Sequence, residues 1–541
     1  MTTADHTYDF IVTGAGSAGC AVAGRLSESG RYRVLLLEAG DRDRNPWIHV
    51  PMGSSRLFAD PRVNWMYDSE PEPELDGRSM YQPRGKVLGG TSSINGMVYM
   101  RGNPADYDEW RQRGCTGWDW DSVLPYFKKA EDQERGPDAF HGVGGPLRVS
   151  DPPVRWELAE RWIAAAIEAG LPANPDFNGA RQEGAGHFQS TTNQRRRWST
   201  AAAYLRPARM RRHLTVQTNA HATRILIEDG RAVGVSFVTD GMLQTARARG
   251  EVIICGGAFN SPQLLQLSGL GPAELLQEFG IPLVRDMPAV GAGLQDHFNV
   301  RLVFRCTKRI TLNNVADSFV RQALAGAQYA LFRSGPLANN GVCAGAFARS
   351  DARLDRPDLQ LNFMNWSVGE RDGSRVRAHP FPGFSVYVVH LRPEARGSVR
   401  LKSPDPLAPP AIRFNFLRTR EDVRALTAGM RLTRKIARQP ALAGYVAEEI
   451  LPGSDVQTDA DFEATIRASG LSNLHPVGTC RMGEDESAVL DPRLRVRGVG
   501  RLRVADASVM PSVPAGNTNA PSIMIGEKAS DMILEDAREA A

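Results

Sequence analysis

The start of the chain alternates apolar runs with a glycine-rich turn. Residues 8–13 form a short apolar run that predicts a buried strand, and small apolar residues then continue with helical character to about Ser29. Residues 33–37 are a second apolar run, which ends at Glu38. A strand, a helix and a strand in this order predict a βαβ unit of a parallel sheet.

Further apolar and polar patterns predict the rest of the secondary structure. Consecutive strands are predicted at 214–217, 222–228, 232–239 and 251–255, and a last strand at 501–505. The region 306–470 alternates strand-like runs (383–391 and 398–401) with a helix-like run (421–438), and we interpret it as the substrate-facing region. An amphipathic helix is predicted from about Ile523, and residues 41–83, rich in Pro, Asp and Glu, are predicted to be an extended excursion over the surface.

Composition narrows the class of protein. The chain has 541 residues, more than one hydrophobic core usually holds, with 42% hydrophobic and 23% charged residues. This balance excludes a mainly disordered chain, and the lack of any run of 18 apolar residues argues against a transmembrane helix. A net charge of +4 does not predict a nucleic-acid partner. Aromatic residues between Asp106 and Glu131 are expected to anchor a core.

Cysteine usage and the N-terminus predict a cytoplasmic protein. The six cysteines are far apart and form no C-x-x-C motif, which argues against a disulfide framework and against a metal site, and indicates reduced, buried thiols. No basic segment followed by an apolar one precedes the first strand, so no signal peptide is expected. Peripheral membrane contact stays open. The basic run 195–197 is interpreted as a solvated loop or edge, with a gate for anionic substrates as the alternative.

The first glycine motif predicts a dinucleotide site. Gly14 permits a tight turn, Gly16 lets the backbone approach a pyrophosphate, and Gly19 allows close packing of the helix on the strand. The helix N-terminus favours phosphate, and Glu38 is placed to accept hydrogen bonds from ribose hydroxyls, which disfavours NADP. The motif alone does not distinguish FAD from NAD. The predicted contacts are Gly14, Gly16, Ser17, Ala18, Gly19, Glu38 and Ala39.

Several further segments together carry a family resemblance. They are the glycine-rich stretch 85–96, the stretch 257–271, Gly293-Leu294-Gln295-Asp296-His297, residues 475–483 (HPVGTCRMG) and residues 516–521 (GNTNAP). With the N-terminal motif they resemble the glucose-methanol-choline (GMC) oxidoreductase family, over nearly the whole chain. The most similar branch is the bacterial choline dehydrogenase-like group of alcohol dehydrogenases.

The resemblance implies a fold, a cofactor and a domain division. The fold is α/β (α+β overall), with a Rossmann-like FAD-binding domain in discontinuous segments and a substrate domain built on an antiparallel sheet with helices. The FAD-binding domain is expected at 1–155, 206–305 and 471–541, and the substrate-binding domain at 156–205 and 306–470. Some relatives attach FAD through a histidine in the segment after Gly89-Gly90. That segment has no histidine here, so we predict non-covalent FAD.

The resemblance also implies FAD contacts beyond the first motif. Asp506 and Ala507, after the last strand, look like the element that holds the ribityl chain and pyrophosphate, and Ala222 is expected to contact the adenine through its backbone. The implied contacts are Val87, Gly90, Asn95, Gly96, Met97, Val98, Ala222, Asp506, Ala507, Asn517 and Thr518. A plain strand-end cap is the structural alternative for Asp506.

The chemistry expected of this family needs a base beside the flavin. An alcohol donates hydride readily only after its proton is removed, and a histidine with a pKa near neutrality suits this task. By resemblance the base is His475, and the group that holds the alcohol oxygen is Asn517, with Asn519 as the reserve and helix capping as the alternative for both. His297 is expected to pack or hydrogen-bond, and His390 is a weak candidate for the pocket.

The implied reaction is FAD-dependent oxidation of a primary alcohol to an aldehyde, with electrons passed to a quinone or another acceptor. An oxidase that uses oxygen and makes hydrogen peroxide is the main alternative, and a light-driven fatty-acid decarboxylase or a redox-silent flavoprotein are less favoured. No carboxylate dedicated to a choline-like ammonium is evident. Four aromatic residues of the substrate region are candidates either for an apolar pocket or for the core: Phe363, Trp366, Phe381 and Phe384.

Overall fold

The first apolar run forms β1 (Thr7–Thr13), the centre of a mostly parallel sheet. β1 pairs in parallel with β2 (Val34–Leu37) on one side and with β13 (Met242–Ile254) on the other. All four side chains of β2 are buried, as expected of a parallel strand covered on both faces. The computed structural model describes residues 7–372 and 375–539.

This first sheet has seven strands in the order β10-β2-β1-β13-β12-β11, with β27 paired to β13. Its remaining strands are β10 (Leu214–Gln217), β11 (His221–Glu228), β12 (Arg231–Thr239) and β27 (Leu502–Val504). It is therefore assembled from the N-terminal, middle and C-terminal parts of the chain.

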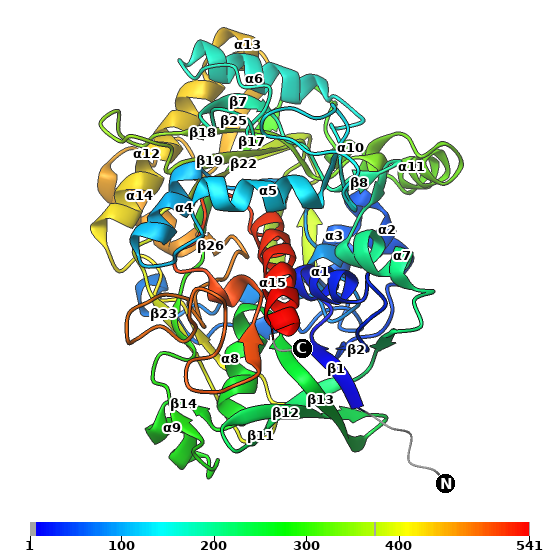
Figure 1. Ribbon diagram of the computed structural model, residues 1–541. Coiled ribbons are helices and arrows are strands. Elements are labelled where there is room, and N and C mark those ends of the chain that lie inside the picture. Colours follow the sequence, from blue (N-terminus) through cyan, green and yellow to red (C-terminus); the bar gives the residue numbers. More distant parts are fainter. Residues whose placement is uncertain (1–6, 373–374, 540–541) are drawn as a thin grey trace.

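Two helices from opposite ends of the chain pack closely beside this sheet: α1 (Ser17–Leu26) and α15 (Asn519–Glu539) (Figure 1). A Cβ on Gly526 would lie 2.7 Å from the Ala18 carbonyl oxygen, so only glycine allows this approach of the two backbones. The guanidinium of Arg25 donates to both carboxylate oxygens of Glu527, at 2.8 and 2.9 Å. The N- and C-terminal helices are thus held in register by packing and by a bidentate ion pair.

The second large sheet is antiparallel and lies at the other end of the molecule (Figure 1). Its order is β25-β17-β22-β19-β18-β7, with β26 paired to β17. The strands are β7 (Gly184–His187), β17 (Phe298–Cys306), β18 (Val342–Ala348), β19 (Leu359–Met364), β22 (Gly383–His390), β25 (Val446–Leu451) and β26 (Leu471–Ser472). The two sheets together give the α/β (α+β) class predicted from the sequence.

Helices cover both sheets. They include α4 (Pro104–Gln112), α5 (Trp120–Ala130), α6 (Glu157–Glu168), α8 (Gly257–Leu267), α11 (Phe319–Phe332), α12 (Arg420–Ala437) and α14 (Asp459–Ser469). On the antiparallel sheet, Gly429 of α12 lies against Val388 of β22, and a Cβ at this glycine would approach the valine to 2.3 Å. Within residues 7–372 and 375–539, no helix has the length and apolar character needed to span a bilayer.

Three predicted elements differ from the structure. β13 begins at Met242 rather than at 251, and the region 41–83 contains the short helices α2 (Pro46–His49) and α3 (Ser54–Leu57) besides extended chain. The last helix begins at Asn519, not near Ile523, because Pro521 falls in the first turn, where its missing N–H breaks no hydrogen bond. Asn519 is therefore the first residue of the helix rather than part of the loop before it.

The predicted core residues are buried. Tyr107, Trp110 and Trp118 are almost fully inaccessible, which confirms the aromatic segment as a core anchor. All six cysteines are free and buried. Phe363 and Phe384 pack in the core of the antiparallel sheet, so they are core residues and do not line the cavity described below.

Candidate active site

A cavity opens where β1 and β2 end. It has a volume of ≈ 400 Å³, within the range of small-molecule sites, and Thr13 and Leu37, the last residues of these two strands, are part of its wall. Ligands of parallel α/β sheets bind in this crevice, beyond the carboxyl ends of the strands. His475 and Asn517 line the same cavity, which therefore joins the predicted nucleotide site to the predicted catalytic residues.

Glycines bring two loops together at the start of α1. Gly14 has φ +104°, and a Cβ there would lie 2.4 Å from the Cys255 carbonyl oxygen. Gly90 has φ +52°, and a Cβ there would lie 2.7 Å from the Cα of Gly16. The two glycine motifs predicted from the sequence therefore meet backbone to backbone, and Gly90 does not tolerate a side chain at the contact.

The N-terminus of α1 is open toward the cavity. Gly16, its N-cap, makes no side-chain capping bond, and a Cβ on Gly16 would find no atom within 4 Å. The first N–H groups of a helix lack intrahelical partners and favour an anion, so the arrangement fits the pyrophosphate of a dinucleotide. Ser17 follows in the first turn, and its hydroxyl donates to Asn519 Oδ1 at 2.8 Å. The reserve candidate Asn519 thus contacts α1.

Glu38 lies at the carboxyl end of β2, as predicted. Its carboxylate accepts hydrogen bonds from the backbone N–H groups of Ala15 and Gly40, at 2.9 and 2.8 Å. Burial raises the pKa of Glu38 to about 7, and these two N–H groups oppose the rise. A buried carboxyl group at this edge suits hydrogen bonding to ribose hydroxyls and disfavours a second anion.

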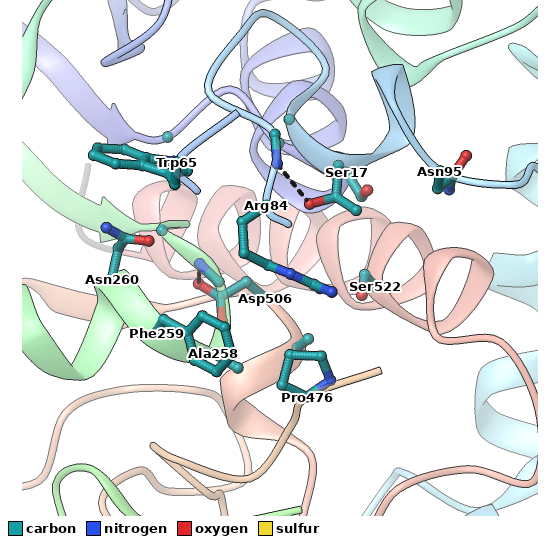
Figure 2. A pocket seen from close by; sticks show the side chains of 18 of the residues that line it. Ser17, Trp65, Arg84, Asn95, Ala258, Phe259, Asn260, Pro476, Asp506 and Ser522 are labelled. Carbon is teal, nitrogen blue, oxygen red and sulfur yellow. Dashed lines mark hydrogen bonds between the residues drawn. The ribbon is translucent and has the colours of Figure 1, made fainter. Parts of the chain in front are cut away.

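Asp506 has a structural task as well as a place in the cavity wall. Its carboxylate accepts from the backbone N–H groups of Gly257 and Ser508, both at 2.8 Å, and from the hydroxyl of Ser261 at 2.5 Å. These bonds tie the end of β27 to the start of α8. Asp506 is therefore the strand-end cap that was the structural alternative in the sequence analysis. It also borders the cavity (Figure 2).

The backbone around His475 is held by the segment that contains Asp296. Gln295 and Val477 exchange two backbone hydrogen bonds, at 2.9 and 3.0 Å. The carboxylate of Asp296 accepts from the His475 N–H at 2.7 Å and from the Ser472 hydroxyl. Burial raises the pKa of Asp296 to about 6. The loop that carries His475 is therefore anchored on both sides of the imidazole.

Three side chains approach the two ring nitrogens of His475. Nε2 lies 3.0 Å from the Asn517 amide nitrogen, and Nδ1 lies 3.0 Å from Nδ1 of His297. The Asn473 amide lies 3.2 Å from the same Nδ1. On the far side, His297 Nε2 lies 3.2 Å from the Leu391 carbonyl oxygen. Both imidazoles are at least nine-tenths buried.

Burial decides the charge of both histidines. It lowers the pKa of His475 well below its ordinary value, and the neighbouring His297 and the positive charge of Arg84 act in the same direction. It lowers the pKa of His297 to about 3. Both rings are therefore neutral at pH 7, and each has one N–H and one free lone pair.

Arg84 extends into the cavity (Figure 2) and was not singled out from the sequence. Its guanidinium donates to the Leu474 carbonyl at 2.8 Å, and its Nε has no partner among the described residues. Burial lowers its pKa to about 10, so it remains a cation next to His475 at neutral pH. Its position immediately before Gly85, in the second glycine-rich stretch, was the signal in the sequence that could have identified it as a site residue.

Most of the predicted site residues line the cavity, and two do not. Those that do are Gly14, Gly16, Ser17, Ala18, Glu38, Ala39, Gly90, Asn95, Gly96, Met97, Val98, Ala222, His475, Asp506, Ala507, Asn517, Thr518 and Asn519. Gly19 instead contacts the Gly14 carbonyl, where a Cβ would approach to 1.9 Å, and Val87 is buried in a small apolar cluster with Ile48 and Ile94. His390 lies outside the cavity wall, 3.3 Å from the Asp422 carboxylate.

Of the basic run 195–197, only the first two residues are exposed as predicted. Arg197 is buried, and its guanidinium donates to the Asn95 side chain at 2.8 Å and to the Ile48 carbonyl at 2.8 Å. Alternation in the short strand β9 (Arg196–Arg197) turns one arginine outward and the next inward. The interpretation as a solvated edge is therefore wrong for Arg197, which braces a loop of the cavity wall.

Comparison with known proteins shows which proteins this chain is similar to. Models of the GMC oxidoreductase family match residues 8–299 and 393–526. The chain is 44% identical over 531 residues to an alcohol dehydrogenase [acceptor] of Pseudomonas putida, covering 97% of this chain and 96% of that protein. It is 44% identical over 528 residues to an oxygen-dependent choline dehydrogenase of Brucella suis, covering 97% and 95%.

Solved structures share the whole fold. Pyridoxine 4-oxidase from Mesorbium loti superposes with a TM-score of 0.88 at 30% identity, covering 97% of this chain and 99% of that one. A formate oxidase variant from Aspergillus oryzae RIB40, made to test FAD modification, superposes with a TM-score of 0.91 at 27% identity, covering 99% of both chains.

The contact between the glycine motifs gives a first prediction. Gly90→Ala places a methyl group against Gly16 and strains a left-handed backbone, so the purified variant is expected to contain less flavin per chain than the wild type. Flavin absorbance divided by protein concentration measures this. Gly326→Ala, at a helical glycine with open space around it, is the control and keeps the wild-type flavin content. A full flavin complement in Gly90→Ala would contradict the close approach.

The cavity wall also predicts how the flavin is held. The stretch Gly90–Val98, where some relatives attach the cofactor, contains no histidine. Precipitating the holoenzyme with acid is therefore expected to leave a colourless pellet and a yellow supernatant. Flavin that stays with the pellet after washing would show a covalent bond.

Proposed function

Since this chain belongs to the GMC oxidoreductase family, we propose that it oxidises a primary alcohol to an aldehyde with non-covalent FAD, using His475 as the base. The observation that carries the proposal is the placement of a buried, neutral imidazole and an amide, with Nε2 and Nδ2 3.0 Å apart, in the cavity that also contains the dinucleotide motif. FAD, the cofactor of this family, supplies the hydride acceptor when it is bound.

The hydrogen-bond partners assign the tautomer of His475. His297 Nε2 faces a carbonyl oxygen, which only accepts, so this nitrogen has the proton and His297 Nδ1 is an acceptor. His475 Nδ1 must then donate across the 3.0 Å contact, which leaves the lone pair of His475 on Nε2. With this assignment the Asn473 amide turns by 180° to present its oxygen to His475 Nδ1, at the expense of the hydrogen bond that this oxygen accepts from Asn299 Nδ2 at 3.2 Å.

The same logic orients Asn517. Gln360 Nε2 donates to Asn517 Oδ1 at 3.4 Å, so the Asn517 NH₂ group points at His475 Nε2. A hydroxyl group beside this pair replaces their mutual hydrogen bond, with its proton toward the base and its oxygen accepting from the Asn517 amide. His475 takes the hydroxyl proton on Nε2, and Asn517 stabilises the alkoxide as its charge develops, a contribution of about 3 kcal/mol for one donor in a closed site.

Arg84 adds a fixed positive charge to this region. It lowers the pKa of His475 further and keeps the base in its neutral form, ready to accept a proton. Negative charge that develops on the substrate side is attracted by the same guanidinium. The buried cation therefore keeps the base neutral before the reaction and attracts the developing alkoxide, although it disfavours the imidazolium that forms.

The cavity wall favours a neutral alcohol over a quaternary ammonium. Among its described residues the carboxylates are those of Glu38 and Asp506, and each accepts two backbone N–H bonds elsewhere in the site. On the catalytic side the wall is formed by amides and by uncharged side chains such as Val342, Met364 and Tyr387. Selective binding of a choline-like cation needs a carboxylate or an aromatic cage that this part of the wall lacks.

Electron transfer onward to a quinone or a similar acceptor is the second part of the proposal, supported by the name of the Pseudomonas putida relative. An oxidase that makes hydrogen peroxide is the alternative, supported by the solved pyridoxine and formate oxidases. Dye reduction compared with peroxide formation under air separates the two. A cytoplasmic location remains our prediction. The His475–Asn517 pair disfavours both a photodecarboxylase and a redox-silent flavoprotein.

The proposal predicts that His475→Ala slows anaerobic reduction of the flavin by neutral primary alcohols by about 10²–10⁴-fold, the usual weight of a general base. Stopped-flow bleaching of the flavin over a panel of alcohols measures it. Because the pKa of His475 is lowered, the wild-type rate is expected to stay level from pH 8 down past 6.5. His213→Ala, an exposed histidine outside the cavity, serves as the control. Normal bleaching in His475→Ala would refute the assignment.

His297 is predicted to act by positioning the base. His297→Phe removes the acceptor for His475 Nδ1–H, so the base loses its preference for the productive tautomer, and the flavin-reduction rate constant falls by roughly tenfold with little change in the alcohol concentration at half-saturation. His297→Gln retains an acceptor and is expected to recover part of the rate. An equal loss in both variants at full flavin content would indicate a packing role only.

A further inference from the structure

An unusual apolar surface lies on α11 (Phe319–Phe332). Thirteen large hydrophobic side chains are strongly exposed in the described chain, and five of them belong to this one helix, with exposed fractions of 65–85%: Phe319, Val320, Leu324, Leu331 and Phe332. Surface hydrophobic residues scattered singly need no explanation, but a cluster of this kind marks an interaction site.

The helix geometry separates an inner from an outer face. Ala325 and Tyr329 are buried and form the inner face. Val320, Leu324, Ala327 and Leu331 follow the spacing of four, three and four residues that aligns side chains along one stripe of a helix, on the opposite side. This outer stripe contains no polar residue, so α11 has an apolar face toward the body of the protein and a second one toward solvent.

Basic residues border this outer stripe. Arg321 and Arg333 are exposed on and directly after the helix. Beside it, Arg195 is exposed in the turn between β8 (Thr192–Asn193) and β9, and Arg196 is exposed at the start of β9. The turn and the helix are in contact, because Tyr329 Oη donates to the Arg195 carbonyl at 3.0 Å and Arg195 Nη1 donates to the Arg333 carbonyl at 3.3 Å. Between residues 313 and 338 the only acidic residue is Asp317, which pairs with Arg309 and Arg321.

We propose that α11, with the arginines at its border, docks this enzyme on the surface of an anionic lipid bilayer. Apolar side chains enter the boundary between headgroups and acyl chains, and the arginines bind the negatively charged headgroups. In Figure 1 α11 projects from the molecule beyond its neighbours, so a flat surface reaches it without obstruction. A second copy of this chain is the less suitable occupant, because a two-fold contact through this face would bring like-charged arginine clusters together.

The docking face is connected to the cavity through one short stretch of chain. After α11, residues 336–338 form a turn, the Asn340 side chain donates to the Gly96 carbonyl at 3.0 Å, and Val342 lines the cavity. The helix therefore belongs to the same part of the molecule as one wall of the catalytic cavity. Docking there would bring the enzyme to apolar molecules dissolved in the bilayer, while α11 itself contributes no residue to the cavity wall.

Vesicle flotation of the holoenzyme tests the proposal without relying on activity. Wild-type protein is expected to float with vesicles of phosphatidylcholine that contain roughly one-third phosphatidylglycerol, and much less with phosphatidylcholine alone, with the difference reduced by salt. Leu324→Glu combined with Leu331→Glu is expected to lower the bound fraction at least about tenfold. Flavin content and thermal unfolding show whether the variant is folded.

Two further variants complete the test. Met242→Glu with Leu243→Glu changes two residues that are 60% and 69% exposed at the start of β13, next to the β12–β13 turn, and this variant is expected to float like the wild type. Arg195→Gln with Arg196→Gln, which leaves the apolar stripe intact, is expected to weaken binding to the anionic vesicles by about fivefold for each arginine. It also keeps the proposal testable if the glutamate variant does not fold.

Three outcomes would overturn the proposal. The first is wild-type protein that floats with neither kind of vesicle. The second is equal flotation of the α11 variant and the β12–β13 control. The third is a wild-type dimer in light scattering that the α11 substitutions convert to a monomer, which would assign this face to a second copy of the chain.

Discussion

Two imidazole nitrogens that lie 3.0 Å apart must share a proton. This requirement determines how the side chains around His475 are oriented. His297 is held by the Leu391 carbonyl, so the proton between the rings belongs to His475 Nδ1, and the lone pair of His475 faces Asn517. Gln360 completes the line by fixing which end of the Asn517 amide faces the base. In a buried site each of these bonds is costly to break, because an unpaired polar group would be left without water.

The fold brings these groups together from distant parts of the chain. His297 comes just before β17 and Gln360 lies on β19, both in the antiparallel sheet, whereas Asn517 precedes α15, which packs on α1. Asp296, just before β17, accepts a hydrogen bond from the His475 N–H and so anchors the loop of His475 to the start of that strand. The proposed reaction centre therefore lies at the boundary between the sheet that precedes the first glycine motif and a second sheet that supplies the orienting side chains.

Local patterns in the sequence were enough to predict which residues near the end of β1 and β2 come together. Gly14, Gly16 and Glu38 follow from strand, turn and helix signals within one short stretch, and their positions along the cavity agree with that reading. His297 was expected to pack or hydrogen-bond and does so. Its partner His475 and the role of Gln360 could not be predicted, because they depend on the pairing of strands far apart in sequence. The outward apolar face of α11 could not be predicted from the sequence either, since periodicity shows that a helix is apolar but not which of its faces is covered.

The most direct test of this account is the protonation state of the His475 ring in the folded holoenzyme. Nitrogen-15 chemical shifts of selectively labelled histidine, assigned by comparison with His475→Ala, distinguish a protonated from an unprotonated ring nitrogen. The account predicts a neutral ring at pH 7 with the proton on Nδ1 and a free lone pair on Nε2. A proton on Nε2, or a doubly protonated ring at that pH, would contradict it.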